Sequence, residues 1–198
     1  NKWKNDQEFR ELIEKEIEKY QIKDDKKKDW IETYIKECVY TLINKVFFLR
    51  ICEDRGHIGE KLTDKGLEAW KSAFSNISLH EWVNISFQDI GKKFKTFYQR
   101  TIYDELECSE QTLEKLIDYM NDYNFKNMSR DIIGTVYERY LDRKERKALG
   151  QFYTPKFVID YILENIGLSL DKKIIDFACG SGGFLIGAYD KFEGIWKS

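Results

Sequence analysis

Pairs of apolar residues recur every four positions between Trp30 and Phe47, and this pattern constrains the fold more than any other feature of the chain. Such spacing places the pairs along one broad stripe of an α-helix. So wide a stripe predicts a central helix packed on more than one side, ending near Gly56 because glycine commonly follows a last helical turn. The pairs are Trp30/Ile31, Tyr34/Ile35, Cys38/Val39, Leu42/Ile43 and Val46/Phe47.

The composition also favours helices. Of the 198 residues, 34% are charged, 42% are hydrophobic and one is proline. High charge with little proline is typical of solvated helices rather than of sandwiches or barrels, and the apolar content excludes a disordered chain. The net charge of −2 argues against an autonomous nucleic-acid-binding module, though not against part of a larger DNA enzyme.

Further helical patterns surround the central one. One apolar face predicts a helix over residues 9–20, and the acid–base run at residues 23–29 is expected to be a solvated connector. The remaining patterns predict shorter helices over residues 63–74, 90–98, 113–120 and 132–141. Residues 1–146 hold five glycines and residues 147–198 hold seven. We therefore expect a helical domain over residues 1–146 and the beginning of an α/β domain over residues 147–198.

The cysteines and histidines indicate neither a disulfide framework nor a metal site. Four cysteines are scattered without a Cys-x-x-Cys pair, which is typical of reduced thiols in a cytoplasmic protein. His57 and His80 are isolated, and no spacing of His, Cys and Asp suggests a metal centre. No apolar stretch approaches the ~18 residues of a membrane span, so we expect a cytoplasmic location and no membrane partner.

The segment around Asp176 predicts a ligand site. Residues 174–178 indicate a short strand, and ligands of open α/β sheets bind at the carboxyl ends of strands. Gly180, Gly182 and Gly183 would then form a turn that a ligand can approach closely, and the next helix would point its positive end at that ligand. A nucleoside with a charged amino-acid tail suits this geometry.

The glycines alone leave a second interpretation open, a plain strand–turn–helix crossing. A phosphate loop suits the residues less well, since no Gly-Lys-Ser/Thr follows the turn. A dinucleotide fingerprint is also weaker, because the spacing is Gly-x-Gly-Gly.

An upstream segment contains the single proline. Thr154 is expected to cap a helix that Pro155 opens and that runs to Gly167. In one interpretation this is a capped helix on the edge of the sheet. In the other, Tyr153 and Thr154 face the same crevice as the Gly180 turn. The predicted apolar face consists of Phe157, Val158, Tyr161, Ile162 and Ile166.

In order and spacing, the two segments resemble two cofactor motifs of the gamma-class N6-adenine DNA methyltransferases. Residues 151–155 look like the motif before the cofactor strand, and residues 176–184 are similar to motif I, with Phe177 where proline is commoner. The resemblance implies a truncated Rossmann-like methyltransferase fold and S-adenosylmethionine as the cofactor. It assigns cofactor binding to Gln151, Phe152, Tyr153, Thr154, Pro155, Asp176, Ala178, Gly180, Ser181, Gly182 and Gly183.

The same resemblance implies adenine-N6 methylation of double-stranded DNA in a restriction–modification or phage-exclusion system. A specificity subunit or fused specificity domain would be a further partner. Residues 44–56 and 134–141 resemble the helical domains of such enzymes. A surface ion-pair cluster, rather than a DNA contact, is nevertheless expected from Arg50, Glu53, Asp54 and Arg55. Within it, Arg50 and Asp54 have the i,i+4 spacing of a helix ion pair. Phosphate contact is expected first from Lys144, Arg146 and Lys147.

No catalytic residue is assigned. The family acts through an Asn/Asp-Pro-Pro-Tyr/Phe motif, which is missing from a chain whose only proline is Pro155. We therefore expect an N-terminal, inactive fragment of a methyltransferase. The alternative is a helical protein–protein docking or DNA-binding domain without catalytic activity, in which the glycine turn is a remnant.

Overall fold

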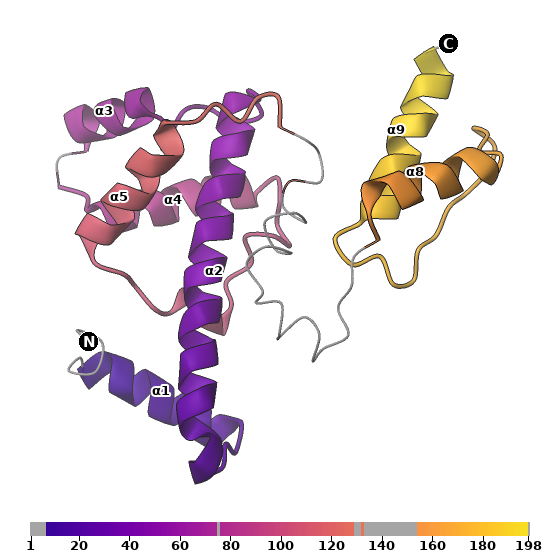
Figure 1. Ribbon diagram of the computed structural model, residues 1–198. Coiled ribbons are helices and arrows are strands. Elements are labelled where there is room, and N and C mark those ends of the chain that lie inside the picture. The colour runs from indigo at the N-terminus through magenta and orange to yellow at the C-terminus, as the bar shows by residue number, and fades with distance from the viewer. Residues whose placement is uncertain (1–6, 75, 129–131, 133–153, 198) are drawn as a thin grey trace. The chain divides into compact units, whose positions relative to one another are not determined.

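The computed structural model describes residues 7–74, 76–128, 132 and 154–197 (Figure 1). The chain separates into two compact units, Asn1–Lys126 and Asn127–Ser198. All regular secondary structure in the described residues is helical, which confirms a mainly α chain. No helix within these ranges is long and apolar enough to cross a membrane. The domain boundary expected after residue 146 lies outside the described residues and stays a prediction.

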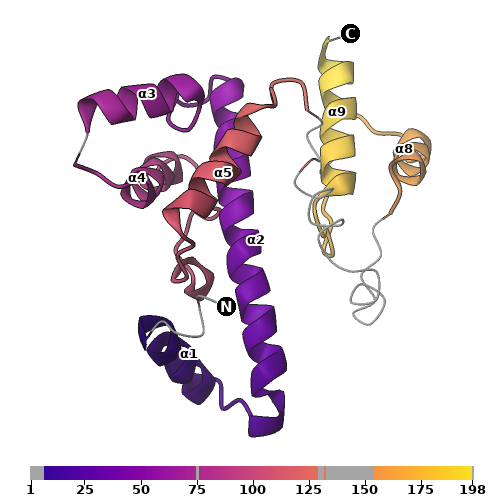
Figure 2. The ribbon, with the colours of Figure 1, turned by 60° about the vertical axis from the view of Figure 1, so that its left-hand side comes forward.

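The long helix α2, Lys27–Asp54, is the axis of the first unit (Figures 1 and 2). Helix α1, Gln7–Lys19, covers one face of its N-terminal half, where apolar side chains of both helices form a small core. The C-terminal half is buried on more than one side, with Val46 and Leu49 fully buried. Helix α2 ends just before Gly56, whose φ is +69°. The predicted central helix is thus confirmed, although it begins three residues before Trp30.

Three shorter helices gather around the C-terminal half of α2 (Figure 2). They are α3, Asp64–Ala73, α4, Leu79–Gly91, and α5, Glu110–Asn121. Each begins after a Ser or Thr side chain that accepts a hydrogen bond from a backbone N–H of the first turn, which satisfies a donor left free by the helix. Helices α3 and α5 confirm the helices expected at residues 63–74 and 113–120. The predicted helix at residues 132–141 falls almost wholly outside the described residues.

The helix predicted over residues 90–98 is wrong. Helix α4 lies earlier in the chain and ends at Gly91, and the following residues form consecutive turns. The carbonyl of Ile90 accepts hydrogen bonds from the N–H groups of both Lys93 and Phe94, each at 3.0 Å. The aromatic residues that suggested a helix pack against Phe48 instead, with the Phe97 ring centroid 4.6 Å away. Their spacing therefore reflects a tight turn anchored on α2.

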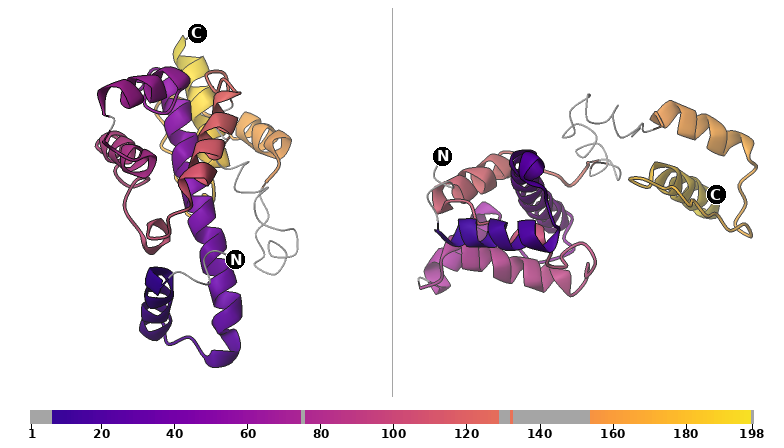
Figure 3. Two further views of the ribbon diagram at one scale, coloured as in Figure 1. Left: turned by 90° about the vertical axis from the view of Figure 1, so that its left-hand side faces the viewer. Right: turned by 90° about the horizontal axis from the view of Figure 1, so that it is seen from below.

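The described part of the second unit contains α8, Lys156–Asn165, and α9, Gly183–Lys197, which cross each other (Figures 1 and 3). Ile159 and Leu163 of α8 form the core with Ala188 of α9. The contact depends on glycine, because a Cβ atom on Gly187 would lie 2.7 Å from Cδ1 of Leu163. The missing side chain therefore lets the two helices approach closely.

Two details of α8 correct the sequence analysis. Pro155, not Thr154, occupies the N-cap position, and the carbonyl of Pro155 accepts hydrogen bonds from the next turn. The predicted apolar face is also wrong, because Phe157 and Tyr161 are 74% and 68% exposed. The helix carries apolar residues on two faces, and α9 covers the face that contains Ile159.

The strand expected at residues 174–178 is not formed in the described part of the chain. A strand requires a hydrogen-bonded neighbour, and the described residues of this unit contain only turns and helices besides this segment. Ile175 and Phe177 are accordingly 71% and 91% exposed. The start of a Rossmann-like sheet therefore remains a prediction.

Candidate functional site

The predicted cofactor turn is a tight backbone loop before α9. Gly180 and Gly182 have φ angles of +55° and +87°, in the region that side chains other than glycine rarely adopt. The N–H of Gly182 donates to the carbonyl of Cys179 at 2.7 Å, and the Gly182 carbonyl accepts from Ile186 at 2.8 Å. These glycines are thus required by the path of the backbone itself.

The first turn of α9 presents the features of an anion site. Ser181, Gly182 and Gly183 are half-buried and stand where the helix begins. The first N–H groups of a helix have no partner within it and carry the positive end of its dipole. Such groups can bind a carboxylate or phosphate that approaches along the helix axis.

Asp176 is oriented by the turn that follows it. Its Oδ1 accepts a hydrogen bond from the N–H of Ala178 at 3.0 Å, and the side chain is half-buried. This short-range contact fixes the carboxylate at the entrance to the glycine turn. An Asp in this place can accept hydrogen bonds from hydroxyl or ammonium groups of a ligand.

The starts of α8 and α9 lie together. A Cβ atom on Gly183, the first residue of α9, would lie 3.0 Å from Cδ1 of Ile159, one turn into α8. Packing thereby brings the end of the upstream motif, Thr154 and Pro155, toward the helix that follows the glycine turn. Neither sequence motif signals this contact, because Ile159 belongs to the helix between them.

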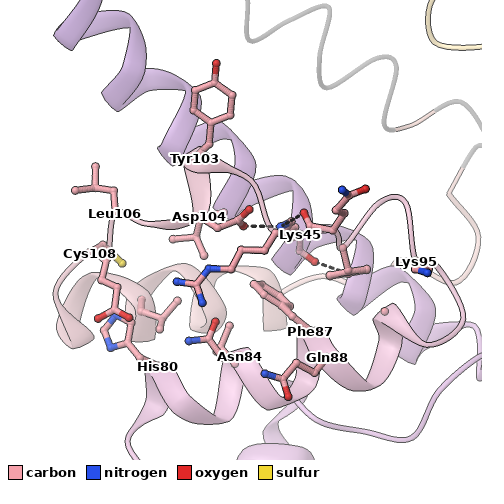
Figure 4. Close-up of a pocket in the computed structure, with 18 residues that line it drawn as sticks. Lys45, His80, Asn84, Phe87, Gln88, Lys95, Tyr103, Asp104, Leu106 and Cys108 are labelled. Carbon is pink, nitrogen blue, oxygen red and sulfur yellow. Dashed lines mark hydrogen bonds and ion pairs between the residues drawn. The ribbon is translucent and has the colours of Figure 1, made fainter. Parts of the chain in front are cut away.

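A cavity of about 440 Å³ lies in the first unit, between α4 and the segment that leads to α5 (Figure 4). His80, Asn84 and Gln88 form one of its walls from successive turns of α4. Lys45 and Asp104 both line the cavity and form an ion pair with each other, the lysine side chain being 7% exposed. The pair joins α2 to the short 3₁₀ helix Ile102–Asp104. None of the residues predicted to bind the cofactor lines this cavity.

The charged cluster at the end of α2 is buried, which corrects the surface location expected for it. Arg50 is 3% exposed and donates to Glu53 at 2.8 Å and to Asp54 at 3.1 Å. The Glu53 carboxylate also accepts hydrogen bonds from the backbone of Lys61 and Leu62, and Asp54 accepts one from Phe125. Burial raises the pKa of Glu53. The cluster therefore joins three parts of the first unit, and the predicted pairing of Arg50 with Asp54 is confirmed.

The C-terminal region of the chain matches a known protein family. Residues 128–195 match the N-6 DNA Methylase family, and this range contains both predicted cofactor motifs. We call residues 128–195 the N-6 DNA methylase region, after the family that they match. No solved structure matches the chain significantly.

Curated relatives of the chain are restriction–modification proteins. The chain is 27% identical to the type II restriction enzyme and methyltransferase RM.Eco57I of Escherichia coli, over 83% of this chain and 19% of that protein. It is 36% identical to the methylase subunit of the type I restriction enzyme EcoEI of Escherichia coli, over 39% of this chain and 16% of that subunit. For the HindI methylase subunit of Haemophilus influenzae, the identity is 31% over 59% of this chain and 29% of that subunit. The chain thus spans less than a third of the length of each of these relatives.

Within the N-6 DNA methylase region, the structure describes most of the predicted cofactor residues. Gln151, Phe152 and Tyr153 lie outside the described residues. The others stand at the start of α8 or between residue 176 and the start of α9. Among the residues that the structure describes, no group of three or more His, Cys, Asp or Glu is arranged to hold a metal ion.

Proposed function

We propose that this chain is part of a DNA adenine-N6 methyltransferase of a restriction–modification or phage-exclusion system. The observation that carries the proposal is the convergence of the starts of α8 and α9 within the N-6 DNA methylase region. It brings the glycine turn and the end of the upstream motif into one part of the second unit. The similarity of the chain to type I and type II methylases supports the same function.

S-adenosylmethionine is the proposed cofactor, and it would supply an activated methyl group for transfer to the adenine amino group. The residues present suit such a molecule. The N–H groups at the start of α9 suit its carboxylate, and Asp176 suits a hydroxyl or ammonium donor. We assign the same role in cofactor binding to the residues of the upstream motif, Gln151 to Pro155.

Base recognition and methyl transfer are proposed to reside outside these 198 residues. An enzyme that acts on a base must extrude it from the duplex and hold it between apolar or aromatic groups. The sequence lacks the Asn/Asp-Pro-Pro-Tyr/Phe motif that would do so, since Pro155 is its only proline. We expect the chain to be inactive alone, with duplex DNA and a specificity subunit or domain as partners of the intact enzyme.

The proposal is tested by the longer polypeptide that contains this chain. We expect it to include an Asn/Asp-Pro-Pro-Tyr/Phe motif after Ser198 and to transfer labelled methyl groups from S-adenosylmethionine to adenine in DNA. Asp176→Ala should abolish that transfer while circular dichroism stays unchanged. Calorimetric titration of S-adenosylmethionine into the 198-residue chain should give weak or no binding. A natural stop codon after Ser198 would refute the proposal.

One observation favours the alternative, a helical docking domain without catalytic activity. The predicted strand is not formed, and Phe177 is 91% exposed beside the glycine turn. If this alternative holds, the Asp176→Ala variant of the longer polypeptide would bind S-adenosylmethionine no more weakly than the original protein.

A further inference from the structure

A basic turn follows α4 in the first unit. The nine residues from Lys92 to Arg100, which we call the basic turn, contain four cations and no acidic residue. The unit as a whole is acidic, since residues 1–126 contain 22 Lys and Arg against 25 Asp and Glu. Positive charge is therefore concentrated locally on a unit of opposite net charge.

Aromatic anchors hold the basic turn in place. The rings of Phe94 and Phe97 pack on Phe48 of α2, with centroids 5.0 and 4.6 Å away. Tyr98 is 9% exposed, and its hydroxyl donates to the carbonyl of Lys45 at 2.8 Å. Since the aromatic side chains point inward, the backbone that carries the lysines is fixed before any partner binds.

The four cations of the basic turn face solvent. The side chains of Lys92 and Arg100 are 78% and 74% exposed, and Lys93 and Lys95 are exposed as well. Figure 4 shows Lys95 on the turn, apart from the Lys45–Asp104 pair. Because packing of the aromatic residues already holds the backbone of the turn, binding of a polyanion should order mainly the lysine side chains.

Acidic side chains near the basic turn neutralise only part of its positive charge. Lys92 pairs with Asp89 at 3.1 Å, and Arg100 pairs with Glu105 at 3.0 Å. Exposed ion pairs of this kind contribute little stability, so a phosphate can replace the carboxylate at small cost. Lys61 also approaches Asp89, at 3.4 Å. Cations therefore outnumber acids around the turn.

We propose that the basic turn binds the phosphate backbone of duplex DNA. The inference rests on the proposed function, because that function makes DNA the polyanion on which the intact protein acts. Lysines that contact phosphates position a protein on the duplex without reading its sequence. The contribution of the turn should therefore be independent of DNA sequence and should fall steeply with salt.

The test compares two triple variants of the 198-residue chain with equal changes in charge. In one, Lys92, Lys93 and Lys95 are each replaced by Gln. In the control, the same replacement is made at Lys26, Lys27 and Lys28, a run that lies among Asp24, Asp25 and Asp29 at the start of α2. Binding of a fluorescein-labelled duplex is measured by anisotropy over a range of salt concentrations, and circular dichroism verifies the fold.

We expect the basic-turn variant to bind at least about tenfold more weakly at low salt, and its salt slope to fall by about 3, since each phosphate contact contributes about 0.9. The DNA affinity of the control variant should stay within about twofold of that of the original chain, because neighbouring acidic residues already balance the three lysines that it replaces. Equal losses in both variants would indicate an effect of net charge and overturn the proposal. Failure of the unchanged chain to bind the duplex at about 50 mM salt would overturn it as well.

Methyl transfer by the longer polypeptide separates this proposal from the proposed function. Turn-dependent DNA binding without any methyl transfer would refute the proposed function alone. Methyl transfer with unchanged DNA affinity in the basic-turn variant would refute the role of the turn alone.

Discussion

The substitution Arg50→Met tests the buried ion pairs of the first unit most directly. Arg50 is 3% exposed, and its guanidinium neutralises two carboxylates, those of Glu53 and Asp54. Methionine fills much of the space of the arginine stem, so the packing loss is small. The two carboxylates, however, remain inside the protein without their cation.

The expected cost is about 3–5 kcal/mol of unfolding free energy, the usual effect of removing one partner from a buried ion pair. Backbone N–H groups of Leu62 and Phe125 still donate to the carboxylates at 2.7 Å, which limits the loss. Against a typical total of about 5–15 kcal/mol, this change would leave the unit marginally stable at neutral pH.

The effect should depend on pH. Burial raises the pKa of Glu53 above its ordinary value, so the folded protein holds that proton to higher pH than the unfolded chain does. The stability contributed by this proton is present at low pH and lost as the pH rises through the raised pKa. Arg50 opposes this rise in the pKa of Glu53. Removing Arg50 therefore extends to higher pH the range over which the bound proton stabilises the folded protein. The loss of unfolding free energy in the Arg50→Met variant should be largest at neutral pH. It should shrink toward about pH 4.3, the ordinary pKa of glutamate.

Urea unfolding followed by tryptophan fluorescence and circular dichroism measures the deficit at several pH values. Arg100→Met is the matched control, because it removes the same side chain from an exposed pair with Glu105. The control should cost no more than about 1 kcal/mol. Equal deficits for the two variants, or an Arg50→Met deficit that is constant from low to neutral pH, would refute the assignment of a buried, charge-coupled cluster.

Four further changes test the packing and capping, each measured by urea or thermal unfolding. Gly66→Ala should cost about 3 kcal/mol, because its Cβ would lie 2.5 Å from the backbone carbon of Lys61, which cannot rotate away; an unchanged midpoint would contradict this contact. Gly187→Ala should destabilise the second unit by about 1–3 kcal/mol, and Leu163→Ala in the same chain should remove that extra penalty. Gly194→Ala, with open space around the new methyl group, should stabilise α9 by up to about 1 kcal/mol, and a loss would refute the open environment. Ser78→Ala should cost about 1 kcal/mol by removing the capping box with Glu81, and a neutral result would show that the cap is not formed.

Sequence reasoning succeeded where local chemistry decides the structure. The apolar pairs of α2 predicted a helix buried on several sides, and the shape of the glycine turn was apparent from Gly180 and Gly182. The capping box of Ser78 with Glu81 was equally readable in the sequence, yet α4 was missed. The apolar spacing from Ile90 to Tyr98 predicted a helix after α4 instead.

The remaining errors concern tertiary partners, which local patterns do not specify. Arg50 and Asp54 are spaced for an exposed helix pair, but the cluster also receives contacts from distant parts of the chain, such as the N–H of Phe125, which donates to Asp54. Helix α8 carries two apolar faces, and the position of α9 decides that Ile159 rather than Phe157 is buried. The cofactor assignment remains a prediction, since it depends on the family resemblance rather than on the pattern alone.

The glycine contacts between α8 and α9 have a consequence for the evolution of related chains. The methyl groups of Ile159 and Leu163 occupy the space that side chains on Gly183 and Gly187 would require. Mutations at these paired positions should therefore be compensatory: a lineage that acquires alanine at 187 should carry a smaller residue at 163. The helix between the two cofactor motifs would thus co-vary with the second motif even if it never touches the cofactor.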